Sequence, residues 1–156
     1  MRRDRSRRVG GVTGIATSVQ VVRPGFAVRD PRQSLLRSAR HVPAVNQVQF
    51  SPFHFRRSLL DYCLDHGIAF EAYSPLERGR GVRDPTIIEL AERVDRTPAQ
   101  VLLRWAIQHR TIVIPKSSSQ ERIRSNAQVF DFELGDDDMR PLDALDRTNG
   151  GANARG

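Results

Sequence analysis

Side chains able to carry out covalent or metal chemistry are few in this sequence and widely spaced. Cys63 is the only cysteine, so an intramolecular disulfide is excluded and a reducing compartment is favoured. The histidines are His41, His54, His66 and His109. Their positions show no metal-ligand spacing with Cys63 or with one another, and we therefore expect no metal site.

A second set of polar residues lies at the ends of short apolar runs, where side chains are available to a ligand. Lys116 directly follows the run TIVIP and is the only lysine in the chain. Gln47 is expected at the C-terminal end of one apolar run and Tyr73 at the end of another. Ordinary structural roles also fit: Gln47 could be a satisfied polar group, and Tyr73 could belong to the core. The residues alone leave both interpretations open.

Alternating strands and helices would position these residues. Apolar runs predict strands at 44–50, 68–74 and 111–115. Amphipathic spacing and capping residues predict helices at 32–40, 57–66, 84–94, 98–109, 119–127 and 136–145. Short apolar strands separated by amphipathic helices are typical of parallel β/α units, so the sequence predicts an α/β fold.

Particular residues add detail to the predictions for two of these helices and one strand. Thr97 and Pro98 have the types expected of a helix cap and a first helical residue. The segment that begins at Ser119 has an acid, Glu121, at its third position, which predicts a capping box. The β-branched run TIVIP, closed by Pro115, predicts a buried strand.

The positive charge of the chain is concentrated at its N-terminus. The formal net charge is +7, of which residues 1–40 carry +8 and the remainder −1. Residues 1–31 lack a regular period, and we expect a basic tail that is disordered or adventitious. A transit peptide is an alternative for this tail, although its amphipathic pattern is poor. Residues 150–156 are expected to form a flexible C-terminus.

Hydropathy predicts a protein that does not enter membranes. No stretch approaches the roughly 20 consecutive apolar residues that span a bilayer. Together with the single cysteine, this favours a cytoplasmic protein. Outside the basic tail, the charge balance gives no reason to expect nucleic acid as a partner.

Five segments together resemble the aldo-keto reductase family, in that family's order and spacing. They are HVPAVNQVQFSPF, GIAFEAYSPL, TPAQVLLRWAIQ, IVIPKSSSQERIRSN and VFDFELGDDDM. The resemblance covers roughly residues 38–149, and its most specific part is IPKS followed nine residues later by Asn126. It implies strands six to eight of a (β/α)8 TIM barrel. Since a complete barrel needs about 250 residues, we expect residues 32–149 to form a partial barrel, the C-terminal half.

The resemblance implies that NADP(H) is the cofactor. Gln47 resembles the residue whose amide binds the nicotinamide carboxamide, and Tyr73 resembles the aromatic residue that stacks on the nicotinamide ring. Ser74 and Leu76 resemble residues at the pyrophosphate. Arg78 or Arg80 could add charge there, although loop arginines are usually only solvated.

The adenosine end of the cofactor is assigned in the same way. Lys116, Ser117 and Arg122 resemble the residues that hold the 2′-phosphate, at a loop that runs into a helix N-terminus. Asn126 resembles the residue that contacts the adenine. At the preceding position the family often has Glu or Gln, whereas this chain has Ser125.

The catalytic residues of the family do not have counterparts in this sequence. The family uses an Asp, a Tyr, a Lys and a His from its first four strands, with tyrosine as the proton donor. Here the only lysine is Lys116 and the only tyrosines are Tyr62 and Tyr73. The Ser-Asn pair that the family places after strand five is also missing before Pro43, where the resemblance fades. A frameshift, truncated gene or wrong start site would produce this pattern.

The resulting hypothesis is a fragment of an NADPH-dependent carbonyl reductase that binds cofactor and is inactive alone. Its family substrate would be a small carbonyl compound, and exposed barrel edges predict self-association. One alternative is a non-catalytic half that binds cofactor or pairs with a separately encoded N-terminal half. Another is an interaction protein that binds nucleic acid through its basic tail.

Overall fold

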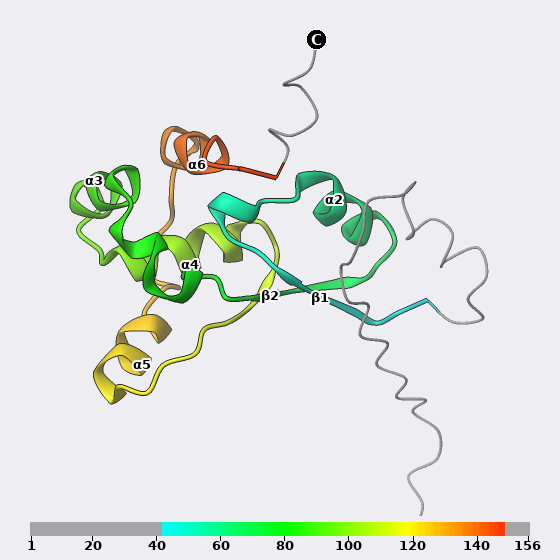
Figure 1. Cartoon of the computed structure of the whole chain (residues 1–156), viewed down its shortest axis with the longest axis horizontal. Coiled ribbons are helices and arrows are strands. Elements are labelled where there is room, and N and C mark those ends of the chain that lie inside the picture. Colours follow the sequence, from blue (N-terminus) through cyan, green and yellow to red (C-terminus); the bar gives the residue numbers. More distant parts are fainter. Residues whose placement is uncertain (1–41, 149–156) are drawn as a thin grey trace, which may run out of the picture.

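The computed structural model describes residues 42–148 and contains a sheet of three parallel strands (Figure 1). The strands are β1 (Val45–Gln49), β2 (Ala69–Tyr73) and β3 (Ile112–Ile114), in the spatial order β1-β2-β3. The predicted strands and their parallel arrangement are confirmed. The predicted tail (1–31), the predicted helix at 32–40 and the C-terminus (150–156) lie outside the described residues.

Within residues 42–148, five α-helices connect and flank the strands, and each begins and ends within two residues of its predicted position. They are α2 (Arg57–Asp65), α3 (Pro85–Arg93), α4 (Pro98–Gln108), α5 (Gln120–Ala127) and α6 (Asp136–Asp143). Three short 3-10 helices also occur, η1 (Pro52–His54), η2 (Glu77–Gly79) and η3 (Gly81–Arg83). In the part of the chain that the structure describes, no helix has the length and apolar character needed to cross a membrane.

The helix caps agree with the sequence except at α5. The Thr97 hydroxyl accepts from the Gln100 backbone N–H (3.2 Å), and the Gln100 side chain accepts from the Thr97 N–H (2.9 Å), which completes a capping box. At α5 the Ser119 hydroxyl caps the backbone N–H of Arg122. The predicted capping box there is wrong, because Glu121 is the second residue of α5 and the required third position holds Arg122.

The two faces of the sheet differ in what covers them. Successive strand residues alternate between faces, and on one face Val48, Phe70 and Ala72 are buried under the helices. In Figure 1, α2, α4 and α6 are drawn above the strands. On the opposite face, Ile112 and Ile114 are 50% and 41% exposed. The prediction that the third strand is buried is therefore wrong for this face.

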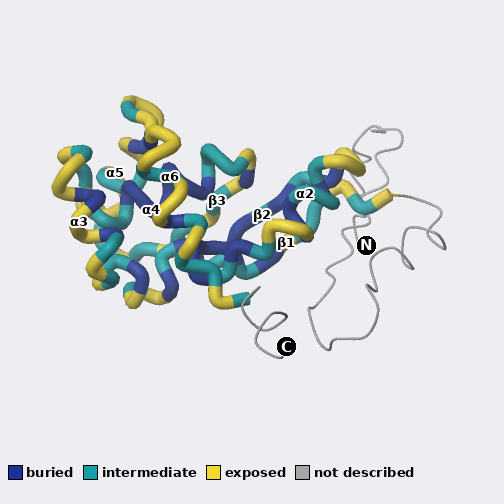
Figure 2. Tube along the Cα trace, turned by 90° about the horizontal axis from the view of Figure 1, so that it is seen from above, coloured by how far each residue is buried: buried dark blue, intermediate teal, exposed yellow. Residues whose placement is uncertain are grey.

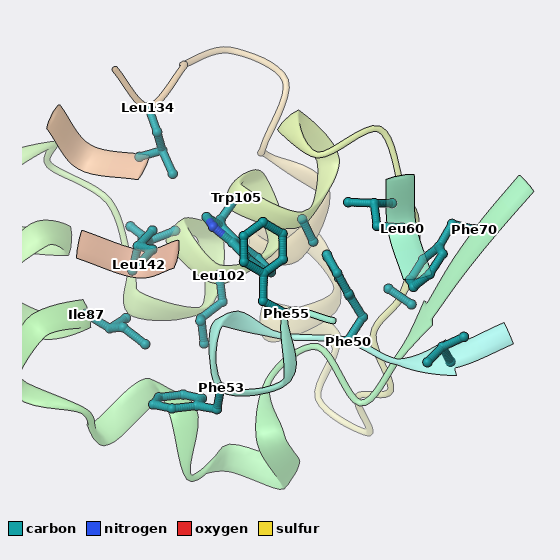
Figure 3. Close-up of a cluster of buried hydrophobic side chains, with 14 of the residues drawn as sticks. Phe50, Phe53, Phe55, Leu60, Phe70, Ile87, Leu102, Trp105, Leu134 and Leu142 are labelled. Carbon is teal, nitrogen blue, oxygen red and sulfur yellow. The ribbon is translucent and has the colours of Figure 1, made fainter. Parts of the chain in front are cut away.

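The core lies between the covered face of the sheet and the helices, around Trp105 of α4. The Trp105 side chain is fully buried, and its ring is stacked on Phe50 with centroids 5.0 Å apart. Phe55 meets the same indole edge-on at 5.1 Å. Figure 3 shows these three rings together at the centre of the cluster. Phe50 directly follows β1. Its packing against Trp105 therefore fixes the chain at the C-terminal end of that strand.

Candidate functional site

The C-terminal ends of the three parallel strands meet at one edge of the sheet, which is where β/α proteins place ligands. Gln49 is paired with Tyr73, and Tyr73 is paired with Ile114. The segments that follow these residues therefore begin side by side. Gln47 lies in the middle of β1, two residues before the strand ends, so its predicted place at the strand end is corrected.

Gln47 is oriented by a neighbour in the adjacent strand. Its Nε2 atom donates a hydrogen bond to Oε1 of Glu71, the residue paired with it in β2. An ionised carboxylate can only accept, so the amide must present its NH₂ group to Glu71. The Oε1 atom of Gln47 is then the part of the amide that can accept a hydrogen bond from a ligand.

The loop after β2 has an unusual backbone. Ser74, Glu77 and Arg78 have positive φ angles of 52°, 51° and 55°, and Gly79 has 83°. The backbone N–H of Glu77 donates to the carbonyl oxygen of Ser74 (3.0 Å), which closes a turn. A left-handed conformation costs a non-glycine residue about 1–2 kcal/mol, whereas glycine adopts it freely. Contacts elsewhere must therefore hold the loop in this shape.

The Glu77 side chain makes such contacts. Its residue is only 8% exposed, and its Oε1 atom accepts from the Ser51 hydroxyl at 2.5 Å and contacts Nδ1 of His54 at 3.0 Å. The amide of Gln49 lies 3.5 Å from both carboxylate oxygens. This cluster was not predicted from the sequence, because its members are up to 28 residues apart and only the fold brings them together.

The predicted phosphate residues lie between β3 and α5. The Ser117 hydroxyl accepts from the Ser119 N–H at 3.2 Å and lies 3.4 Å from Nε of Arg122. Lys116, two residues after β3, is exposed, as is Arg122. Within residues 42–148, neither cation forms an ion pair with an acidic side chain. Two uncompensated positive charges and a hydroxyl at a helix N-terminus suit an anion.

The remaining predicted residues are placed as follows. The backbone of Ser74 opens the loop just described, and Leu76 precedes η2 and packs partly buried against the core. Asn126 lies near the end of α5 and is partly buried. The Gln100 amide of α4 donates to the carbonyl oxygens of Ser125 (3.1 Å) and Gln128 (3.0 Å), which fixes that end of α5.

The tyrosine and lysine side chains that proton transfer could use belong to different elements of the fold. Tyr62 lies on α2, where its ring stacks on His66 with centroids 4.1 Å apart. Tyr73 ends β2, and Lys116 follows β3. Among residues 42–148, no three His, Cys, Asp or Glu side chains are placed to hold a metal ion.

Comparison with known proteins identifies the family. The family model described as "Aldo/keto reductase family" matches residues 25–147. Glyoxal reductase of Bacillus subtilis is 44% identical over 115 residues, which cover 74% of this chain and 42% of the relative. An aldo-keto reductase of Mycolicibacterium vanbaalenii is 50% identical over 104 residues, covering 67% of this chain and 37% of the relative. The chain thus spans about two fifths of the length of these curated relatives.

Solved structures share the fold as well. The apo crystal structure of Gox0644 superposes on this chain with a TM-score of 0.72 at 39% identity. The match covers 76% of this chain and 44% of the Gox0644 chain. A mutant of Gox0644 in complex with NADPH gives a TM-score of 0.71 at the same identity and coverage. These matches confirm the predicted α/β fold as part of a larger barrel. This chain belongs to the aldo/keto reductase family.

Proposed function

We propose that this chain is the NADP(H)-binding C-terminal half of a carbonyl reductase. The observation that carries the proposal is the segment between β3 and α5, where Ser117 contacts Arg122 next to exposed Lys116. A similar protein, the Gox0644 mutant, has been crystallised with NADPH. The 2′-phosphate of NADPH would bind to the two cations and to the helix N-terminus. NADH lacks this phosphate, so these groups would favour NADPH over NADH.

The other end of the cofactor would lie along the strand ends. Gln47 and Tyr73 lie on the same face of the sheet, because Gln47 is paired with Glu71 and Tyr73 follows two residues later in β2. Oε1 of Gln47 would accept from the nicotinamide carboxamide, and the Tyr73 ring would stack on the nicotinamide. Ser74 and Leu76 would meet the pyrophosphate, and Asn126 would contact the adenine.

In the whole protein NADPH would supply a hydride to a small carbonyl substrate. This chain would bind and orient the dinucleotide, but the acid that protonates the carbonyl oxygen would have to come from elsewhere. We therefore assign no catalytic residue to this chain and propose that it is inactive alone. Buried Cys63, the only cysteine, supports a reducing location such as the cytoplasm.

The 2′-phosphate assignment is tested by titrating NADPH and NADH against the wild type and Arg122→Ala. A charge-assisted hydrogen bond contributes roughly 1.5–3 kcal/mol, so the substitution should weaken NADPH about ten- to a hundredfold. NADH, which lacks the phosphate, should lose less than about twofold.

Arg124→Ala is the matched control, because Arg124 is an exposed arginine of the same helix. It should leave both affinities near those of the wild type. Equal losses of NADPH and NADH in Arg122→Ala would mean that Arg122 supports the fold and does not recognise the phosphate.

The purified chain should not oxidise NADPH with simple aldehydes at a rate above background. General acid catalysis contributes about a hundred- to ten-thousandfold, and substrate orientation adds more. The measurement follows NADPH absorbance with the chain alone. Turnover that survives further purification would show that a proton donor is present and has been misplaced.

A second candidate function is a non-catalytic half that pairs with a separately encoded N-terminal half. The exposed isoleucines at positions 112 and 114, on the face of the sheet that the described helices leave open, favour this candidate. Mixing the chain with a polypeptide that supplies the first five β/α units should then restore NADPH oxidation. Failure to co-purify with that polypeptide would count against pairing.

A further inference from the structure

Glu77 is the most completely hydrogen-bonded side chain at the edge of the sheet where the strands end. It is buried, and it lies in a loop that begins directly after β2. Its three side-chain partners are Gln49, Ser51 and His54. They all belong to the segment at the end of β1 and in η1. The carboxylate therefore joins two separate chain segments.

The partners are themselves held firmly. Ser51 is 1% exposed, and its carbonyl oxygen accepts from the His54 N–H at 2.9 Å. Neighbouring Phe50 is fully buried against Trp105. The β1 side of this contact thus belongs to the core, whereas the Glu77 side belongs to a loop with an unfavourable backbone. Because the core is close-packed, it is the loop that gains a fixed conformation from the contact.

Close packing at Gly81, two residues beyond the loop, limits the path of the chain that leaves it. Gly81 follows in η3, and a Cβ atom added there would lie 3.2 Å from the Leu102 side chain and 3.5 Å from Cβ of Glu77. The backbone N–H of Arg80 donates to the carbonyl oxygen of Glu77 at 3.1 Å. The chain that follows Glu77 therefore returns to the core at Gly81.

We propose that Glu77 is a positioning residue for the cofactor: its buried carboxylate, bound to Ser51, His54 and Gln49, holds the loop at residues 74–79 in the shape that receives the pyrophosphate. This inference rests on the proposed function, which places Ser74 and Leu76 at the pyrophosphate. The Glu77 carboxylate is already engaged by Ser51, His54 and Gln49, so we infer that it acts only through the backbone of the loop.

The experiment compares two ligands that use different parts of the site. NADPH spans the loop at 74–79 and the β3–α5 segment, whereas adenosine 2′-monophosphate has the 2′-phosphate and adenine but no part of the pyrophosphate and no nicotinamide. Both are titrated by calorimetry against the full chain. Glu77→Ala should weaken NADPH about tenfold and leave adenosine 2′-monophosphate within about twofold. Glu77→Gln, which retains one acceptor oxygen for Ser51, should recover part of the NADPH affinity.

Glu89→Ala provides the control, since Glu89 is an exposed glutamate of α3. It should change neither affinity. Equal weakening of both ligands by Glu77→Ala would overturn the proposal, because it would indicate general loss of structure. Unchanged NADPH affinity in that variant would overturn it as well.

A second measurement needs no ligand and separates this inference from the proposed function. In Glu77→Ala the amide hydrogens of residues 77, 79 and 80, which are bonded within the loop, should exchange at least about tenfold faster than in the wild type. If the wild type binds neither ligand, the proposed function fails, and this exchange measurement still decides the role of Glu77. Unchanged exchange would show that the carboxylate does not hold the loop.

Discussion

At the scale of single residues, partly buried polar side chains join helices that are distant in sequence. Oδ1 of Asp143, at the end of α6, accepts from Nε1 of Trp105 at 2.7 Å and lies 2.9 Å from Nε2 of His109. Both partners belong to α4 or its C-terminal cap. An ionised carboxylate only accepts, so the neutral His109 ring must carry its proton on Nε2. One carboxylate thereby fixes α6 to α4.

Burial lowers the pKa of His109, although the hydrogen bond and the charge of Asp143 act in the opposite direction. Arg57 adds to the lowering, and Asp61 opposes it. Because the pKa is lower in the folded than in the unfolded chain, the unfolded chain takes up this proton first as the pH falls. The stabilisation is complete above the unfolded value of about 6.5 and is lost as the pH falls through the folded pKa.

We therefore predict that His109→Gln reduces the acid sensitivity of folding. The free energy of unfolding should fall less between about pH 7.5 and about pH 5 in this variant than in the wild type, because one proton-linked contribution is removed. Urea denaturation at several pH values measures the difference. His66→Gln, at an exposed position, is the control and should keep the wild-type decline. An identical decline in all three proteins would rule out His109 as a source of acid sensitivity.

At the scale of elements, α4 organises the fold through its N-terminal end and its buried face. Its capping box begins the helix at Thr97, and its Gln100 amide fixes the end of α5. Trp105 of the same helix stacks on Phe50 after β1. By contrast, α5 has no buried residue and is held mainly by its cap and by Gln100. The helix that carries Arg122 thus depends on α4 for its position.

Thr97→Ala should reduce the free energy of unfolding by about 1 kcal/mol, the usual cost of removing a side-chain N-cap. Chemical denaturation followed by circular dichroism measures it. Thr97→Ser keeps the hydroxyl acceptor and should retain most of the stability. The role of the cap would be contradicted if the alanine and serine variants were equally unstable.

At the scale of the whole molecule, residues 42–148 cover the sheet on one side only. Figure 2 shows the described residues by burial, with buried segments both along β2 and among the helices. On the other face of the sheet, the side chains from the three strands are partly buried or exposed, and Ile112 and Ile114 are among them. Parallel sheets are ordinarily covered on both faces, so this surface favours association.

We expect the isolated chain to self-associate, and the double substitution Ile112→Thr with Ile114→Thr to shift it toward the monomer. Replacing two exposed isoleucines by threonine keeps the β-branched shape and reduces the apolar area that drives contact. Light scattering at several protein concentrations measures the mass. Ile123→Thr, at an exposed isoleucine of α5, is the matched control and should leave the mass unchanged. A wild type that is monomeric at every concentration would refute this prediction.

Local patterns in the sequence were sufficient to predict the order and type of the described strands and α-helices, because these signals act over short distances. Apolar runs placed the three strands, and proline with a polar cap placed the starts of α3 and α4. The family, too, could be identified from short sequence motifs such as IPKS. The cofactor roles carried over from that resemblance remain predictions.

The contacts of each side chain, by contrast, depend on the three-dimensional fold. The run TIVIP has the composition of a buried strand, but burial depends on what lies across the sheet, which a local pattern does not record. Ser51 and Glu77 are 26 residues apart, and Trp105 and Asp143 are 38 apart, so no periodicity joins them. The capping box expected at Ser119 failed for a local reason, since one residue of offset in the helix start moved the acid out of place. Such long-range contacts form only as the chain folds. Those of Glu77 join the loop that follows β2 to the segment after β1.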